Sequence, residues 1–140
     1  MPPRTVAVGV AMALGLAAGP SLAQAAPPQG VWVTASGNLQ VEIAPCGAAL
    51  CGTAVKVLAN NSMSHPGAMA AAPPAAVGLK ILTDLKPVKA GTWQGHIFNR
   101  ENGKTYDCLV TPQGADDLKV RAFVGTPLFG KDQLWRRAAP

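Results

Sequence analysis

Residues 39–58 constrain the fold more than any other stretch, because two strand patterns flank a pair of cysteines there. Residues 39–43 alternate apolar and polar side chains, which is typical of a strand with one buried and one solvated face. Residues 53–58 form the second arm, and the connector is rich in proline, glycine and small residues, which favour turns. Such a turn can place Cys46 and Cys51 opposite each other, with Cα atoms about 5.5 Å apart, inside the range for a disulfide. The pattern therefore predicts a β-hairpin with a disulfide at its tip.

Residues 1–25 have the pattern of a secretory signal peptide. Arg4 precedes an apolar run over residues 6–18, and a small-x-small cleavage site ends at Ala25. The apolar run is shorter than the roughly 20 residues that a transmembrane helix needs, which argues against the alternative of a stable membrane anchor. We therefore expect cleavage after Ala25, a mature chain of residues 26–140 and a periplasmic or secreted location.

The mature chain has a length that suits a single domain. The full sequence contains 12 basic and 7 acidic residues and has a formal net charge of +5. These charges are scattered and form no basic stripe with interleaved aromatic residues. The composition therefore argues against nucleic-acid binding.

Export gives the three cysteines a specific chemical context. In an oxidising compartment, Cys46 and Cys51 are expected to form a structural disulfide. Their spacing is not that of a C-x-x-C motif and no second ligand pair accompanies them, so redox activity and metal binding are the weaker alternatives. Cys108 shares a strand face with Tyr106 and Val110. This placement predicts a buried, inert thiol, with a reactive or intermolecular thiol as the alternative.

The remaining chain contains further strand patterns separated by turns. They cover residues 30–34, 78–82, 92–98, 104–110, 118–124 and 130–137. Together with the hairpin they make eight strands with short connections, apart from a long irregular loop at residues 59–77. We therefore predict an all-β fold, an antiparallel eight-stranded up-and-down barrel, with an open sheet or a sandwich as the alternative. Alternation along residues 118–124 predicts that Val120 and Val124 both face inward.

Gly30-Val31-Trp32 opens the first predicted strand, and Arg136 and Arg137 lie in the last one. These features resemble lipocalin-like barrels, in which a Gly-x-Trp opens the first strand and an arginine of the last strand packs over the indole. The resemblance implies a cation–π contact in which the guanidinium also donates hydrogen bonds to nearby carbonyl groups. An eight-stranded barrel has an interior that is filled by side chains or holds one small ligand.

A longer series of motifs covers nearly the whole mature chain. The series is Gly30-Val31-Trp32, Pro45-Cys46-Gly47-x-x-Leu50-Cys51-Gly52, Gly78-Leu79-x-Ile81-Leu82, Trp93-x-Gly95-x-Ile97, Asn102-Gly103-Lys104-Thr105-Tyr106, Leu118-Lys119-Val120-Arg121 and Gly130-x-x-x-Leu134-Trp135-x-Arg137. It resembles the bacterial exported family called domain of unknown function 2147. The resemblance implies export and a small β-rich domain, and it transfers no catalytic residue, because the family has no established activity.

Residues typical of catalysis are sparse. Of the two histidines, His65 lies in the irregular loop and His96 in a predicted strand. A metal site needs three or four converging ligands, which this pattern does not supply. No serine lies in a nucleophile elbow, and no glycine-rich loop has the spacing of a phosphate cradle. We therefore expect no catalytic residues, no metal and no cofactor, and we do not expect an enzyme.

The aromatic residues make ligand binding the leading hypothesis. Trp32, Trp93, Phe98 and Tyr106 are spread over the predicted strands, where they can line the mouth of a barrel that holds a small, largely apolar ligand. Arg136 is a candidate to orient the polar end of such a ligand. The alternative is that these aromatic side chains only fill the core.

The long loop bears on both functional hypotheses. Its methionines, Met63 and Met69, can repack against a ligand and so cover a binding site. The second hypothesis is an interaction module that recognises another envelope protein or a cell-wall polymer through its outer face or this loop.

Overall fold

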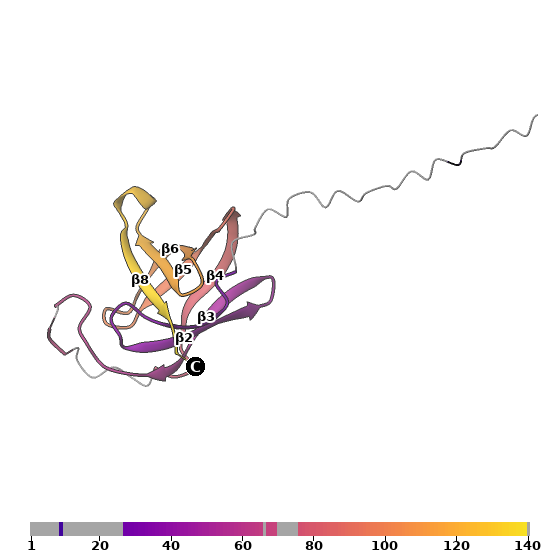
Figure 1. Cartoon of the computed structure of the whole chain (residues 1–140). Helices are drawn as coiled ribbons and strands as arrows, with labels where there is room; N and C mark the ends of the chain where they lie inside the picture. The colour runs from indigo at the N-terminus through magenta and orange to yellow at the C-terminus, as the bar shows by residue number, and fades with distance from the viewer. Residues whose placement is uncertain (1–8, 10–26, 66, 70–75, 140) are drawn as a thin grey trace, which may run out of the picture.

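The computed structural model describes residues 9, 27–65, 67–69 and 76–139. Eight strands form a closed barrel in which each strand pairs antiparallel with its neighbour in sequence, and the last pairs with the first (Figure 1). The strands are β1 Gly30–Val33, β2 Leu39–Cys46, β3 Ala49–Val57, β4 Lys80–Lys89, β5 Thr92–Asn99, β6 Lys104–Gln113, β7 Asp117–Phe123 and β8 Lys131–Arg137. A short 3₁₀ helix, η1 Pro127–Phe129, lies between β7 and β8. The prediction of an eight-stranded up-and-down barrel is confirmed.

Two predicted segments are described only in part. The predicted signal peptide lies outside the described residues, except for Gly9. The described part of the predicted loop contains one isolated bridge, between Asn61 and Met69, and no strand. Within the ranges given above, no helix is both long and apolar enough to cross a membrane.

The alternating sequence pattern explains how β2 forms part of the barrel wall. Leu39, Val41 and Ile43 are buried, whereas Glu42 between them is exposed. Because successive side chains of a strand point to opposite faces, this pattern puts one side of β2 in the core. Alternation also holds at the start of β7, where Leu118 and Val120 are buried and Lys119 between them is less so.

The predicted inward position of Val124 is wrong. β7 ends at Phe123, and Val124 is 72% exposed. Gly125 follows with a positive φ of 78°, so the chain turns there instead of continuing the strand. Val120 is buried as predicted.

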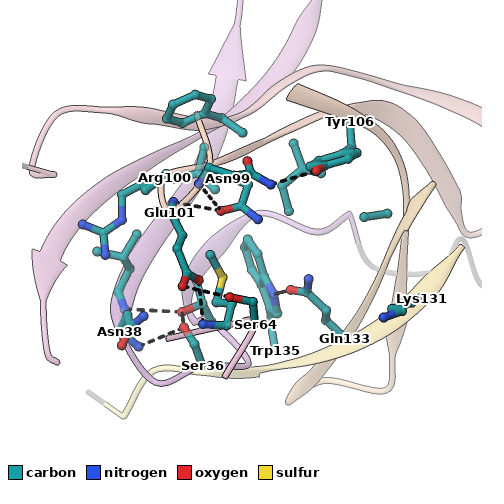
Figure 2. A pocket seen from close by; sticks show the side chains of 18 of the residues that line it. Ser36, Asn38, Ser64, Asn99, Arg100, Glu101, Tyr106, Lys131, Gln133 and Trp135 are labelled. Carbon is teal, nitrogen blue, oxygen red and sulfur yellow. Dashed lines mark hydrogen bonds between the residues drawn. The ribbon is translucent and has the colours of Figure 1, made fainter. Parts of the chain in front are cut away.

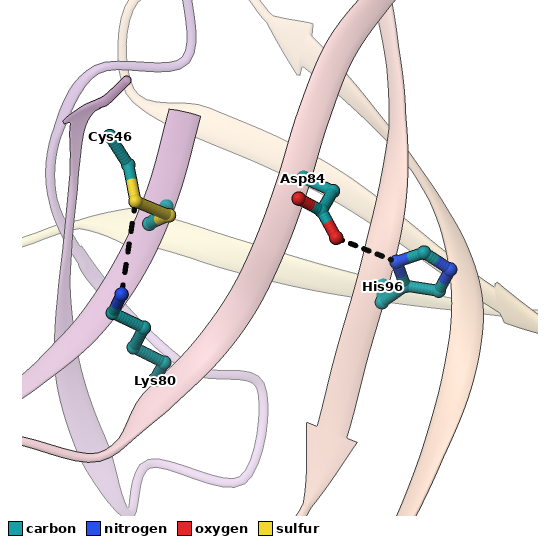
Figure 3. The surroundings of a disulfide bond; sticks show 5 residues. Cys46, Lys80, Asp84 and His96 are labelled. Atoms are coloured by element: carbon teal, nitrogen blue, oxygen red, sulfur yellow. Dashed lines mark hydrogen bonds and ion pairs between the residues drawn. A yellow bond between two sulfur atoms is a disulfide. The ribbon is translucent and has the colours of Figure 1, made fainter. Parts of the chain in front are cut away.

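The predicted disulfide between Cys46 and Cys51 is present, and the strands that carry it are longer than the pattern indicates (Figure 3). β2 and β3 leave only Gly47 and Ala48 as the turn, with Gly47 at a positive φ of 66°. In this register Cys46 pairs with Ala49, so the cysteines are diagonal neighbours and do not lie directly opposite each other. Their Cα atoms are 5.5 Å apart, which suits a disulfide.

The fourth strand also extends beyond its sequence pattern. The sequence pattern predicts a strand at residues 78–82, but β4 continues to Lys89. Its register against β5 shifts next to Asp84, which has a positive φ of 54°. A bulge of this kind breaks the period of two, and the buried residues Leu82 and Leu85 consequently do not alternate.

Trp32 closes the end of the barrel at which β1 begins and β8 ends. The indole is buried, and its Nε1 donates to the carbonyl oxygen of Pro28 at 2.9 Å. The guanidinium of Arg137 lies 4.2 Å from the centre of the indole, and its Nε donates to the carbonyl oxygen of Ala115. The structure thus assigns the lipocalin-like contact to Arg137 and not to Arg136. Gly30 beside it has a positive φ of 125°, which favours glycine, and a Cβ there would displace the Arg137 guanidinium.

Cys108 is a free thiol on the inner face of β6. It is fully buried, as is Val110 on the same face. Burial raises the pKa of Cys108 to about 12, so the thiol is protonated at neutral pH. The prediction that this side chain is buried is confirmed.

Candidate functional site

A cavity of about 770 Å³ opens at one end of the barrel (Figure 2). β2 runs from this end, where Leu39 lines the cavity, toward Cys46, so the cavity and the disulfide lie at opposite ends of the barrel. In Figure 1 the β2–β3 hairpin and the connection that follows β3 correspondingly lie on opposite sides of the molecule. The barrel interior is thus filled by side chains at the Trp32 end and open at the other.

Buried apolar side chains form the floor of the cavity. Trp135 of β8 is only 1% exposed and belongs both to the core and to the cavity wall. Leu39, Ile81 and Ile97 contribute further buried apolar surface from β2, β4 and β5. The indole Nε1 of Trp135 donates to Oε1 of Gln133 at 3.2 Å, so its single donor is satisfied. The floor therefore offers apolar contact with few polar groups.

Asn38 attaches the connection after β3 to the cavity wall. This buried side chain donates through Nδ2 to the carbonyl oxygen of Asn61 at 2.9 Å and accepts at Oδ1 from the Asn61 amide at 2.7 Å. The backbone carbonyl oxygen of Asn38 also accepts from the amide of Leu58 at 2.7 Å. These bonds join residues that are far apart in the sequence and bring Asn60, Asn61, Met63 and Ser64 to the rim, where Figure 2 shows Ser64.

Glu101, in the turn between β5 and β6, forms a second attachment for the same connection. Its carboxylate accepts from the Ser62 hydroxyl at 2.6 Å, the Met63 amide at 2.7 Å and the Ser64 hydroxyl at 3.1 Å. The Ser62 bond, and then the Met63 bond, lower the pKa of Glu101 below its ordinary value of 4.5. The carboxylate is therefore ionised at neutral pH, and its oxygens are occupied by the connection.

Two basic side chains also line the cavity. Arg100 is half-buried, and its Nη1 atom is buried without a hydrogen-bond partner in the described structure. Lys131 at the start of β8 is exposed to solvent. Figure 2 shows the two residues on opposite sides of the cavity, with Trp135 between them.

The structure brings two of the five predicted ligand-binding residues to the cavity. Phe98 and Tyr106 line it, and the Tyr106 hydroxyl accepts from Nδ2 of Asn102 at 2.8 Å. Trp32 lies at the closed end, and Trp93 packs against the filled core. The exposed Arg136, opposite Val33 on β1, does not line the cavity.

Only one of the two methionines that the sequence predicts to cover the site lies at the cavity. Met63 lines the cavity, whereas Met69 is 80% exposed and does not.

Sequence reasoning missed Trp135, Asn38, Arg100 and Glu101 as residues of the cavity. Trp135 follows Gln133 by two residues on β8 and shares its face, so strand alternation was the signal that could have placed it inside. Asn38, Arg100 and Glu101 lie in turns, where the sequence indicates a change of chain direction but not the long-range partner.

A second group of polar residues lies on the outer face of the barrel. Nδ1 of His96 is 3.6 Å from Oδ2 of Asp84 (Figure 3). Its Nε2 is 3.5 Å from Oδ1 of Asp107. All three side chains are at least two-fifths exposed. Across the residues that the structure describes, no group of three or more His, Cys, Asp or Glu side chains has an arrangement that could hold a metal ion.

The barrel is similar to that of a known lipocalin. The solved structure described as "Protein HP1028 from the human pathogen Helicobacter pylori belongs to the lipocalin family" matches with a TM-score of 0.59 and 18% sequence identity. The match covers 79% of this chain and 82% of that chain, and at this identity it shows a shared fold. No curated protein has significant sequence similarity to the chain.

The family comparison agrees with the motif series. The family described as "Uncharacterized protein conserved in bacteria (DUF2147)" matches residues 30–137, which extend from the start of β1 to the end of β8. The chain therefore belongs to this bacterial family and has a lipocalin-like barrel.

Proposed function

We propose that the protein is a non-enzymatic, exported binder of a small, largely apolar ligand. The observation that carries this proposal is the cavity of about 770 Å³ with a floor of buried Trp135, Ile81 and Ile97. This volume lies within the range of about 300–1,000 Å³ that is typical of small-molecule sites. An apolar molecule on this floor would remove apolar surface from water, which favours binding.

The predicted export rests on two separate features. The sequence of residues 1–25 has the pattern of a signal peptide, and the disulfide between Cys46 and Cys51 is typical of proteins outside the reducing cytoplasm. A carrier in the periplasm or outside the cell would meet apolar molecules in an aqueous space that dissolves them poorly.

A fluorescent probe tests the binding proposal. We expect the neutral fluorophore N-phenyl-1-naphthylamine to bind with increased emission, and Ala122→Phe, which fills part of the cavity, to weaken binding roughly tenfold or more. Val55→Phe on the exposed face of β3 is the matched control and is expected to leave the affinity unchanged. Equal affinity in the wild-type protein and the Ala122→Phe variant, or no binding to the wild-type protein, would contradict the proposal.

A second candidate function, recognition of another envelope component, has one observation in its favour. The connection between β7 and β8 exposes Val124, Leu128 and Phe129, with Leu128 83% exposed. Solvent-exposed apolar side chains that are close together often mark interaction sites. If this candidate is correct, Leu128→Ser will reduce in-cell crosslinking to a specific envelope component without changing probe binding, because Leu128 does not line the cavity.

A further inference from the structure

We propose that Arg100 binds the anionic head group of the ligand, so that the ligand class is an amphiphile with a single negative charge, such as a carboxylate on an apolar chain. This inference rests on the proposed function, because the cavity must first hold the apolar part of the ligand. It adds the chemical class of the ligand and the side chain that recognises it.

The first observation is the unused hydrogen-bonding capacity of Arg100. A guanidinium is always charged and carries five N–H donors in a planar fork that matches a carboxylate. Among the described residues, the Arg100 side chain has no hydrogen-bond or ion-pair partner, and its Nη1 atom is buried. A half-buried guanidinium that lines the cavity without a protein partner is unfavourable, so this position favours an occupant that supplies an acceptor.

The second observation concerns the neighbouring acid, Glu101. Its carboxylate could neutralise Arg100, but Ser62, Met63 and Ser64 already donate to it. Figure 2 shows the Glu101 side chain directed toward Ser64, away from the guanidinium of Arg100. The adjacent negative charge is therefore held by the connection after β3 and leaves Arg100 available.

The third observation is the balance of charge in the cavity wall. Its charged lining residues are Arg100, Lys131 and Glu101, so the wall carries one more positive than negative charge at neutral pH. The basic side chains belong to the connections and strand ends, whereas Trp135 and Ile97 form the apolar floor. An amphiphile matches this arrangement, with its apolar part on the floor and its negative group at the rim.

Arg100 is a better anchor for the head group than Lys131. The Lys131 ammonium is exposed, so water and salt screen its interaction with an anion. Arg100 is partly withdrawn from solvent, where a charge-assisted, two-pronged hydrogen bond to a carboxylate is stronger.

Competition experiments with a matched pair of ligands test the assignment. Dodecanoate and 1-dodecanol each compete with N-phenyl-1-naphthylamine for the wild-type protein and for Arg100→Gln. We expect Arg100→Gln to lower the affinity for dodecanoate about tenfold and to change the affinity for 1-dodecanol less than twofold. Only the hydrogen bonds from the charged guanidinium to the carboxylate are lost. Arg100→Lys retains the charge and is expected to recover part of the loss.

Two further variants locate the effect. Arg136→Gln removes the same charge from an exposed position outside the cavity. It is expected to leave the affinities for dodecanoate and 1-dodecanol unchanged. Lys131→Gln is expected to lower the affinity for dodecanoate less than threefold. A larger loss in Lys131→Gln than in Arg100→Gln, or equal losses for both competitors in Arg100→Gln, would overturn the assignment. Failure of the wild-type protein to bind the fluorophore would instead overturn the proposed function itself.

Discussion

At the scale of single residues, one arginine stabilises the closed end of the barrel through several contacts at once. The guanidinium of Arg137 covers the buried indole of Trp32 and donates to the carbonyl oxygen of Ala115 at 2.7 Å. Its Nη1 also donates to the carbonyl oxygen of Gln29 at 3.4 Å. The contact thus ties the segment before β1 and the turn before β7 to the end of β8.

Arg137→Ala is expected to lower the free energy of unfolding by about 2 kcal/mol, because it removes a cation–π contact and hydrogen bonds from a charged donor. Urea denaturation followed by tryptophan fluorescence measures the change. The adjacent Arg136→Ala is the control, and we expect less than about 0.5 kcal/mol there, because Arg136 is exposed on the surface. Equal losses in both variants would show that the Trp32 contact contributes little to stability.

Glu101 predicts a pH dependence for the attachment of residues 62–64. Hydrogen bonds lower the folded-state pKa of Glu101 below 4.5. The ionised carboxylate therefore stabilises the attachment of residues 62–64 fully above the unfolded-state pKa, and this stabilisation is lost as the pH falls through the folded-state pKa. The Met63 amide resonance should therefore titrate with a midpoint below pH 4.5, measured by NMR. Glu101→Gln should abolish this titration, and a midpoint above 4.5 would contradict the assigned contact.

At the scale of elements, the tip of the β2–β3 hairpin depends on a short covalent loop. The disulfide joins Cys46 and Cys51 across a two-residue turn, at the end of the barrel opposite the cavity. Closing so short a loop restricts the unfolded chain only moderately.

We expect the double variant Cys46→Ser, Cys51→Ser to lose about 2 kcal/mol of unfolding free energy while binding N-phenyl-1-naphthylamine as the wild-type protein does. Chemical denaturation and probe titration measure the two quantities. Loss of probe binding by the folded variant would show that the two ends of the barrel are coupled.

The sequence predicted the elements well where the strands alternate regularly. Leu39, Val41 and Ile43 identified β2 and its inner face, and the cysteine pair identified the hairpin tip. It failed where local geometry interrupts the period of two. The bulge at Asp84 concealed the second half of β4, and the turn after Phe123 exposed Val124.

At the scale of the whole molecule, the barrel is filled at one end and open at the other. Strand number and the Gly-x-Trp motif predicted a closed barrel, but they left open whether its interior is filled or holds a ligand. The open end of the barrel depends on contacts between residues that are far apart in the sequence. The contacts of Asn38 with Asn61 and of Glu101 with Ser62 position the rim of the cavity. Sequence periodicity carries no information on such contacts, so the cavity residues in the turns could not be predicted.

The most direct test of the central claim, that the open end of the barrel binds an apolar ligand, is a crystal structure of the protein with N-phenyl-1-naphthylamine. We predict electron density for the fluorophore in the cavity, in contact with Trp135 and Ile97, with the barrel backbone unchanged. A cavity closed by inward rotation of the surrounding side chains, with the fluorophore bound only on the outer surface, would contradict the account.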